Sequence, residues 1–247
     1  MTLNQLYDEW ARDYDQHIWG SGIPIYAVTN GMVGRYIPNY DARILDAGCG
    51  TGGNLHHLGA CPSHTGVDLS ATAIEFCQQR GLPNVIEADV MKLPFENESF
   101  AAVMATSVLY HQWIPSVGAA LQEFHRVLPP GGWLFIDVPA YESLRSDHDD
   151  AVLTARRVNS KMIRDELTSH GFEIRRLTYW TSLLFPLAWI ARRLRLVRSG
   201  RDFDQGRLPN RLINGPLNGL MFLEFQLARL ISLPFGVSLA VVAQKTA

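Results

Sequence analysis

Residues 44–54 read ILDAGCGTGGN, an apolar run that stops at closely spaced glycines. A buried parallel strand that leads into a tight turn has this pattern, and glycine lets a ligand approach the backbone. The spacing Gly48-x-Gly50-x-x-Gly53 also fits dinucleotide-binding loops, but such a match alone is weak evidence. Asp46 favours a cationic group over an anionic pyrophosphate, which binds to backbone N–H groups. The stretch therefore predicts a ligand crevice at the carboxyl edge of a sheet.

Strands and helices alternate after this stretch. Further apolar or alternating segments predict strands at residues 64–68, 84–89, 99–106, 133–139, 172–180 and 237–245. Helical spacing and capping residues predict helices at residues 54–60, 70–80, 117–128 and 160–171. The sequence therefore predicts a Rossmann-like, doubly wound α/β fold with a seven-stranded, mostly parallel sheet.

The chain of 247 residues is interpreted as one domain, because its length and its 47% of hydrophobic residues suit one large core. Within it we expect a helical leader or lid over residues 1–39 and a core that carries the crevice over residues 40–182. An apolar helical insertion follows over residues 183–236, and residues 237–247 return to the sheet as its last strand.

Composition and charge exclude several classes of protein. A formal net charge of −2 gives no electrostatic sign of a nucleic-acid partner. Three cysteines without a CxxC pair favour a reducing cytoplasm and predict neither a disulfide framework nor a zinc ribbon. The first residues lack the pattern of a signal peptide. Glu224 and Arg229 interrupt the longest apolar tract, so no transmembrane segment is predicted.

Four motifs, in order, resemble those of the class I S-adenosylmethionine-dependent methyltransferases. DAGCGTG (46–52) is similar to the first motif of that family and GVDLS (66–70) to the second. Residues 87–106 are similar to the third motif with the fourth strand, and residues 123–139 to the segment around the fifth strand. The resemblance implies S-adenosylmethionine as cofactor and S-adenosylhomocysteine as product.

The loop ATSVLYH (105–111) lacks the Asn/Asp-Pro-Pro-aromatic motif of amino methyltransferases of nucleic acids and proteins. The layout instead resembles the small-molecule branch that includes ubiquinone and menaquinone biosynthesis enzymes. The second half of the chain is similar to a bacterial subgroup assigned to secondary-metabolite, polyketide or surface-polysaccharide pathways. That subgroup carries His and Tyr around a paired arginine, whereas Thr154 and Val158 flank Arg156-Arg157 here.

The family resemblance implies how the cofactor is held. The backbone of Gly48, Gly50 and Gly52 would lie against its homocysteine part, with Asp46 near the ammonium group. Asp68 comes at the end of the second predicted strand, where its two carboxylate oxygens would accept both ribose hydroxyls.

Further cofactor contacts are implied at other strand ends and in the leader. Asp89 would accept a hydrogen bond from the adenine amino group, and Thr106, with Ser107, would lie beside the sulfonium. Cys49, inside the glycine loop, is interpreted as a small packing residue. The remaining implied contacts are apolar or aromatic and comprise Leu69, Val90, Met91, Tyr7 and Tyr14.

Methyl transfer from a sulfonium needs alignment first and proton removal only for some acceptors. His111 is the candidate general base, because an imidazole titrates near neutral pH and the loop after the fourth strand should face the substrate. Tyr110 beside it is the second candidate catalytic residue. Packing of His111 against Tyr110 and Trp113 is an equal alternative. His148 lies among Asp147, Asp149 and Asp150, which we interpret as a solvated loop rather than a metal site.

The predicted function is methyl transfer to an oxygen or carbon of a hydrophobic small molecule. The alternative is a cyclase or isomerase that keeps the cofactor without methylating, and the family motifs make a nicotinamide-dependent oxidoreductase the weakest candidate. In the apolar insertion, five arginines lie within ten residues beside apolar helices: Arg192, Arg193, Arg195, Arg198 and Arg201. We interpret the insertion as a lid over the substrate, with peripheral contact to a membrane or an acidic, lipid-like acceptor as the alternative.

Overall fold

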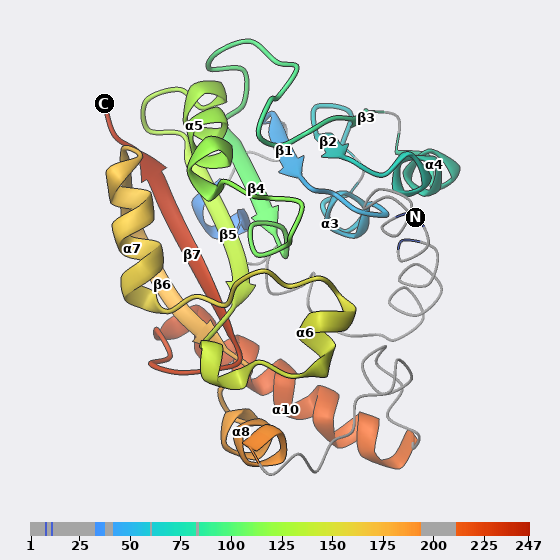
Figure 1. Ribbon diagram of the computed structural model, residues 1–247. Helices are drawn as coiled ribbons and strands as arrows, with labels where there is room; N and C mark the ends of the chain where they lie inside the picture. Colours follow the sequence, from blue (N-terminus) through green and yellow to red (C-terminus); the bar gives the residue numbers. More distant parts are fainter. Residues whose placement is uncertain are drawn as a thin grey trace.

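The computed structural model describes residues 8, 11, 33–37, 42–59, 61–82, 84–193 and 211–247. At its centre lies a seven-stranded sheet in the order β3-β2-β1-β4-β5-β7-β6 (Figure 1). The strands are β1 (Ile44–Ala47), β2 (Thr65–Asp68), β3 (Val85–Glu87), β4 (Ala102–Thr106), β5 (Trp133–Pro139), β6 (Phe172–Trp180) and β7 (Ser238–Lys245).

Strands β1 to β5 pair in parallel, and β7 runs antiparallel to both of its neighbours, β5 and β6. The predicted seven-stranded, mostly parallel sheet is therefore confirmed. Two strands are shorter than predicted, since β3 ends at Glu87 and β4 begins at Ala102. Asp89, predicted at the end of a strand, instead lies in the loop after β3.

Helices connect the strands and cover the sheet. They are α3 (Gly53–His57), α4 (Ala71–Gln79), α5 (Val117–Val127), the 3₁₀ turn η1 (Glu142–Leu144), α6 (Asp147–Ala151), α7 (Ser160–Ser169), α8 (Phe185–Arg193) and α10 (Arg211–Leu230). Ser70 caps α4 as predicted, because its side chain accepts a hydrogen bond from the N–H of Ala73 at 3.1 Å. The acidic cluster around His148, interpreted from the sequence as a loop, instead forms α6, whose first turn is fixed by reciprocal bonds between Ser146 and Asp149.

The apolar core lies on both faces of the sheet. Leu121 and Phe124 of α5 are fully buried against one face. On the other face, residues 33–36 form a helical turn whose Tyr36 ring lies 4.8 Å from the ring of Trp133. Of the expected leader, the structure also describes Asp8, which accepts a hydrogen bond from Ser70, and Ala11, which is buried.

Helices α8 and α10 lie beyond the carboxyl ends of β4 and β5, at the same edge of the sheet as the glycine loop (Figure 1). Glu224 of α10 is buried and accepts hydrogen bonds from the backbone N–H groups of Ser182 and Leu183, at 2.8 and 2.9 Å. The acid that interrupts the apolar tract in the sequence therefore joins α10 to the segment between β6 and α8.

Candidate functional site

The glycine loop after β1 takes its shape from residues in the left-handed region. Gly48 has φ +79° and Gly52 has φ +89°. A Cβ atom at Gly48 would come within 2.3 Å of Val108, and one at Gly52 within 2.4 Å of Leu82. At Gly50 a Cβ atom would meet no described atom within 4 Å. The loop is therefore packed tightly at both ends and open in the middle, where a ligand can approach the backbone.

Asp68 ends β2 and holds this loop in place. One of its carboxylate oxygens accepts a hydrogen bond from the N–H of Gly50 at 2.8 Å, and the other accepts from the N–H of Ser70 at 3.0 Å. A carboxylate has about four acceptor positions, so these bonds are compatible with further donors. Asp68 thus has a positioning role toward the loop that the sequence did not reveal, beside the predicted contact with ribose.

A polar cluster joins the ends of β1 and β4. Asp46 is fully buried, and the side-chain amide of Asn54 donates to it at 3.4 Å and to Thr106 at 2.6 Å. Within the described part of the chain, Asp46 Oδ2 and Asn54 Oδ1 are buried and have no hydrogen-bond partner. Burial raises the pKa of Asp46 to about 7; the bond from Asn54 lowers it, and the nearby charge of Asp68 adds a smaller increase.

Two unpartnered acceptors inside a protein need a donor, because the loss of their hydration is otherwise uncompensated. The donor set that suits Asp46 Oδ2 and Asn54 Oδ1 is a cation with several N–H groups, such as a primary ammonium. The residues present therefore fit the amino-acid end of S-adenosylmethionine. Asn54 was missed from the sequence, although its place directly after the glycine loop offered a signal.

The predicted adenine contacts lie in the loop after β3 and at the end of β2. Asp89 is half-buried, and its side chain accepts a hydrogen bond from the N–H of Met91 at 2.8 Å, which fixes the turn. Val90 is 3% exposed and belongs to the core, whereas Leu69 is only partly buried. The three residues stay predicted contacts of the cofactor, and Val90 has a packing role in addition.

The surroundings of Cys49 do not favour a role as a nucleophile. Its side chain packs with Leu55 and Cys77, and a hydrogen bond to Cys77 together with burial raises the pKa of the Cys49 thiol well above its usual range. A thiol that stays protonated is a poor nucleophile. The geometry agrees with the interpretation of Cys49 as a packing residue, which shapes the loop from beneath.

His111 lies inside the loop after β4 and is 4% exposed. Its ring stacks on Trp113 with centroids 4.0 Å apart and lies 4.1 Å from the ring of Tyr110. Its Nδ1 is 3.1 Å from the carbonyl oxygen of Val152. Burial lowers the pKa of His111 to about 4, while nearby backbone carbonyls raise it. The imidazole is therefore neutral near pH 7, which is the form that accepts a proton.

The paired arginines have structural partners. Arg157 and Asp149 form a buried ion pair at 2.7 Å, and Arg157 also donates to the carbonyl of Ala140 at 2.9 Å. Arg156 donates to the carbonyl of Leu109 at 3.2 Å, in the loop that carries His111. The interpretation of the acidic cluster as a solvated loop is therefore wrong for Asp149, because the arginine compensates its charge in the interior.

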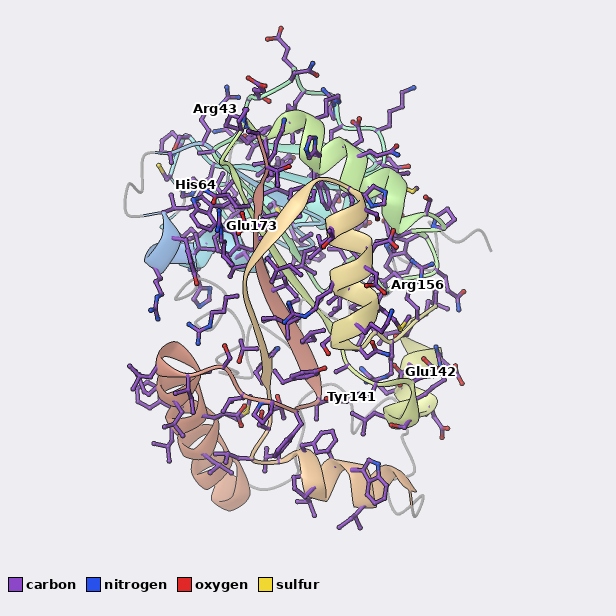
Figure 2. The ribbon with its side chains drawn as sticks, turned by 90° about the vertical axis from the view of Figure 1, so that its left-hand side faces the viewer. Arg43, His64, Tyr141, Glu142, Arg156 and Glu173 are labelled. Atoms are coloured by element: carbon purple, nitrogen blue, oxygen red, sulfur yellow. The ribbon has the colours of Figure 1, made fainter. Side chains whose placement is uncertain are left out.

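The two positions that depart from the related subgroup lie in this same region. Thr154 is buried and forms an antiparallel backbone bridge with His111, and Val158 forms a parallel bridge with Ala140. Thr154, one of the two positions that depart from the subgroup, is therefore directly opposite His111. Figure 2 shows Arg156 and Glu142, both from the segment between β5 and α7, on the same side of the molecule.

Asp137 is a further buried acid that the sequence analysis did not select. It lies on β5, pairs in register with Thr106, and accepts a hydrogen bond from Trp180 Nε1 at 2.7 Å. Burial raises its pKa to about 7, while bonds from Trp180 and Ser107 lower it. The signal was present in the apolar strand WLFIDVP, in which Asp137 is the single charged residue.

Several predicted residues lie outside the part of the chain that the structure describes. These are Tyr7, Tyr14, Arg195, Arg198 and Arg201, together with the side chains of Arg192 and Arg193. Among the residues that are described, no group of His, Cys, Asp and Glu has the arrangement of a metal site. In the same part of the chain, no helix has both the length and the hydropathy needed to cross a bilayer.

Comparison with known proteins shows what this chain is similar to. Residues 45–136 match the family model of a methyltransferase domain. A fatty-acid O-methyltransferase of Mycolicibacterium smegmatis is 33% identical over 138 residues, which are 49% of this chain and 48% of that protein. A phthiotriol/phenolphthiotriol dimycocerosates methyltransferase of Mycobacterium ulcerans is 34% identical over 142 residues, 52% of each chain. The chain thus spans about half the length of the curated relatives it matches.

Solved structures share the fold over a longer stretch. A possible histamine N-methyltransferase from Thermotoga maritima has a TM-score of 0.65 at 16% identity, with 98% of this chain and 99% of that chain covered. The [4+2]-cyclase SpnF has a TM-score of 0.60 at 22% identity, with 90% and 81% covered. The matched domain and the similar O-methyltransferases support a class I S-adenosylmethionine-dependent methyltransferase domain with S-adenosylmethionine as its cofactor, and the solved structures share its fold.

Proposed function

We propose that this protein transfers the methyl group of S-adenosylmethionine to an oxygen or carbon atom of a hydrophobic, lipid-like small molecule. The observation that carries the proposal is the pair of buried acceptors, Asp46 Oδ2 and Asn54 Oδ1, beside the open glycine loop. An ammonium group would satisfy both atoms, and Asp46 would lose its proton as it binds.

Three groups of residues would then hold the cofactor along the carboxyl edge of the sheet. Asp46 and Asn54 take its ammonium, the Gly50 backbone lies against its homocysteine part, and Asp68 accepts from its ribose. The bond from the N–H of Gly50 to Asp68, at 2.8 Å, couples two of these positions, so the sugar end and the amino-acid end are fixed by one loop. Preorganisation of this kind lowers the entropy lost on binding.

When bound, S-adenosylmethionine supplies a methyl group that is already activated on a sulfonium. The protein then has to align an acceptor with this methyl group. When the acceptor is a hydroxyl or carboxyl group, the protein also has to hold or remove the proton of that group. His111 is the candidate for proton removal, because its ring is neutral and its loop follows Thr106 directly. A pKa of about 4 makes it a weak base, so alignment carries most of the proposed rate enhancement.

The apolar character of the proposed acceptor rests on aromatic side chains at the end of β6 and in the segments beyond the sheet. Tyr141 stacks on Tyr179 with ring centroids 5.2 Å apart, and Phe185 of α8 lies 5.8 Å from Tyr141 and 5.5 Å from Phe235. In Figure 2, Tyr141 lies between the sheet and α8. We propose that α8 and α10 act as a lid that excludes water from this side. The two mycobacterial relatives, named for fatty-acid and phthiotriol substrates, support an acceptor of this class.

The rival activity is a rearrangement of a metabolite without methyl transfer. The observation that favours it is Thr154, a position that departs from the His and Tyr pattern of the related subgroup and lies opposite His111. The shared fold of a cyclase shows that the fold accommodates such chemistry but does not favour it here.

One experiment separates the two activities. The protein is incubated with S-adenosylmethionine carrying a deuterated methyl group and a panel of long-chain fatty acids and hydroxylated lipids, and products are followed by mass spectrometry. The proposal predicts products that carry the label, with one S-adenosylhomocysteine formed for each. Products without label and without consumption of the donor would establish the rearrangement, and failure to bind S-adenosylmethionine in a calorimetric titration would overturn both.

A further inference from the structure

Exposed apolar side chains are concentrated on α8, α10 and their flanks. Of the twelve large apolar residues that are exposed in the described part of the chain, ten lie between residues 183 and 235. Leu187 of α8 is 66% exposed and Leu230 of α10 is 80% exposed. Figure 1 shows both helices at one end of the molecule, beyond the carboxyl ends of β4 and β5. Exposed apolar side chains concentrated in this way indicate an interaction surface.

The orientation of α10 is opposite to that of an ordinary surface helix. Leu223, Leu227 and Leu230 follow the i, i+4, i+7 spacing of one helical face, and they are 54%, 38% and 80% exposed. The neighbouring Glu224 is 5% exposed and is fixed from inside by the backbone N–H groups of residues 182 and 183. A surface helix normally presents charges to water and leucines to the core. Here the buried carboxylate fixes the leucines on the outside.

Helix α8 repeats this arrangement and adds an amphipathic aromatic residue. Leu187, Trp189 and Ile190 are exposed by 66%, 43% and 45%, while Phe185 packs inward against Tyr141. Tryptophan has an apolar ring with one N–H donor, which suits the boundary between hydrocarbon and water. We call the exposed side chains of the two helices the apolar helix face: Leu187, Trp189, Ile190, Phe222, Leu223, Leu227 and Leu230.

The charge of the two helices indicates which partner fits this face. By sequence, α8 and α10 contain four arginines, Arg192, Arg193, Arg211 and Arg229, and one acid, Glu224, whose carboxylate is buried and bonded. The chain as a whole has a net charge of −2, so positive charge is concentrated on these elements. A symmetric dimer through this face would bring the arginine-bearing helices of both copies together. An anionic lipid surface instead offers apolar chains and negative headgroups.

We propose that the apolar helix face docks on an anionic lipid bilayer, with α8 and α10 lying in the headgroup region and the carboxyl edge of the sheet toward the membrane. Amphipathic helices bind in this way through apolar burial combined with attraction to anionic lipids. The inference goes beyond methyl transfer, because it concerns where the protein lies and holds for any acceptor. It also gives an apolar acceptor a short path from the bilayer to the cofactor edge.

The test is sedimentation of the protein of residues 1–247 with vesicles, in the absence of cofactor and acceptor. Vesicles of phosphatidylcholine alone are compared with vesicles containing about 30% phosphatidylglycerol, at low and high salt. The triple variant Leu223→Ser/Leu227→Ser/Leu230→Ser removes the outer stripe of α10. Its matched control is Met162→Ser/Ile86→Ser, which changes residues that are 50% and 41% exposed elsewhere on the molecule. Arg192→Gln/Arg193→Gln tests charge without altering the leucines.

The proposal predicts binding to the anionic vesicles that weakens at high salt. It further predicts a loss of at least tenfold in the triple variant, a loss of severalfold in the arginine variant, and no change in the control. All variants should bind S-adenosylmethionine as the wild type does, which shows that they are folded and separates this test from the proposed activity. Wild-type protein that ignores anionic vesicles would overturn the proposal. So would a dimer in light scattering that becomes monomeric in the triple variant without any effect on vesicle binding.

Discussion

Two of the regions that bury a carboxylate do so in opposite ways. Around α6, Asp149 accepts from Arg157 at 2.7 Å and from the N–H of Ser146 at 2.8 Å, so its charge is compensated on the spot. At the glycine loop, Asp46 is equally buried but has one amide contact at 3.4 Å and one oxygen without a partner.

The difference separates a structural acid from a binding acid. A buried charge that is fully paired stabilises the arrangement of its neighbours, and it needs nothing from outside. A buried acid with a raised pKa and an unmet acceptor is stable only as the neutral form, until a cation arrives. The Asp149 carboxylate of the α6 region is therefore compensated without a ligand. The Asp46 carboxylate of the glycine-loop region is compensated only when a ligand binds.

The largest effect is expected in the α6 region, where the buried charge of Asp149 is already paired. Arg157→Ala leaves Asp149 buried without its counter-charge, so we expect the free energy of unfolding to fall by about 3–5 kcal/mol. Urea denaturation followed by circular dichroism measures the change. The double variant Asp149→Leu/Arg157→Leu removes both charges and should recover part of the loss. A fall below about 1 kcal/mol for Arg157→Ala would show that the pair is not the compensated centre of this region.

The opposite result is expected at Asp46. Asp46→Asn removes a charged acceptor but leaves no buried group without a partner, so the free energy of unfolding should not fall. Affinity for S-adenosylmethionine should fall by roughly 10- to 100-fold, because a hydrogen bond to a charged group is worth about 1.5–3 kcal/mol. Calorimetric titration measures the affinity, and Asp137→Asn is the matched control with a buried acid of the same raised pKa. Unchanged binding in Asp46→Asn would remove the distinction between the two regions.

The smallest effect is expected at His111, which lies where the two regions meet. Because its low pKa makes it a weak proton acceptor, His111→Gln should lower turnover by about tenfold, with the affinity for the donor unchanged. Rates at saturating donor and acceptor provide the measurement. A loss of 1000-fold or more would make His111 the main source of catalysis, and no loss would reduce it to a packing residue between Tyr110 and Trp113.

The sequence predicted the glycine-loop region better than the α6 region. Strand periodicity and the glycine spacing identified the sheet and its ligand edge, because both signals are local. The partners of Asp149 could not be predicted, since the contact between Arg157 and Ala140 depends on how two loops fold back on β5. The partners of Glu224 could not be predicted either. In the sequence this acid only interrupts an apolar helix, whereas in the structure it accepts hydrogen bonds from the N–H groups of residues 182 and 183.

Within the candidate site, single residues were predictable and their combinations were not. Asp68 and Thr106 each end a strand and Asp46 is the last residue but one of β1, so their common edge followed from the fold class. That Asn54 would join Asp46 to Thr106 requires α3 to begin directly at the loop, with Gly53 as its first residue. The raised pKa of Asp46 arises from this three-dimensional burial and has no local signature in the sequence.

Proton release on cofactor binding tests the central claim most directly. In the free protein Asp46 is mostly protonated at pH 6, below its raised pKa of about 7, and an ammonium group favours the carboxylate. Titrations of S-adenosylmethionine at pH 6, in two buffers of different ionisation enthalpy, should therefore show release of about one proton per site, and affinity should rise by up to about tenfold per pH unit toward pH 7. Asp46→Asn should abolish both effects. Binding of the wild type without proton release and without this pH dependence would contradict the account, because the cation would then lie away from Asp46.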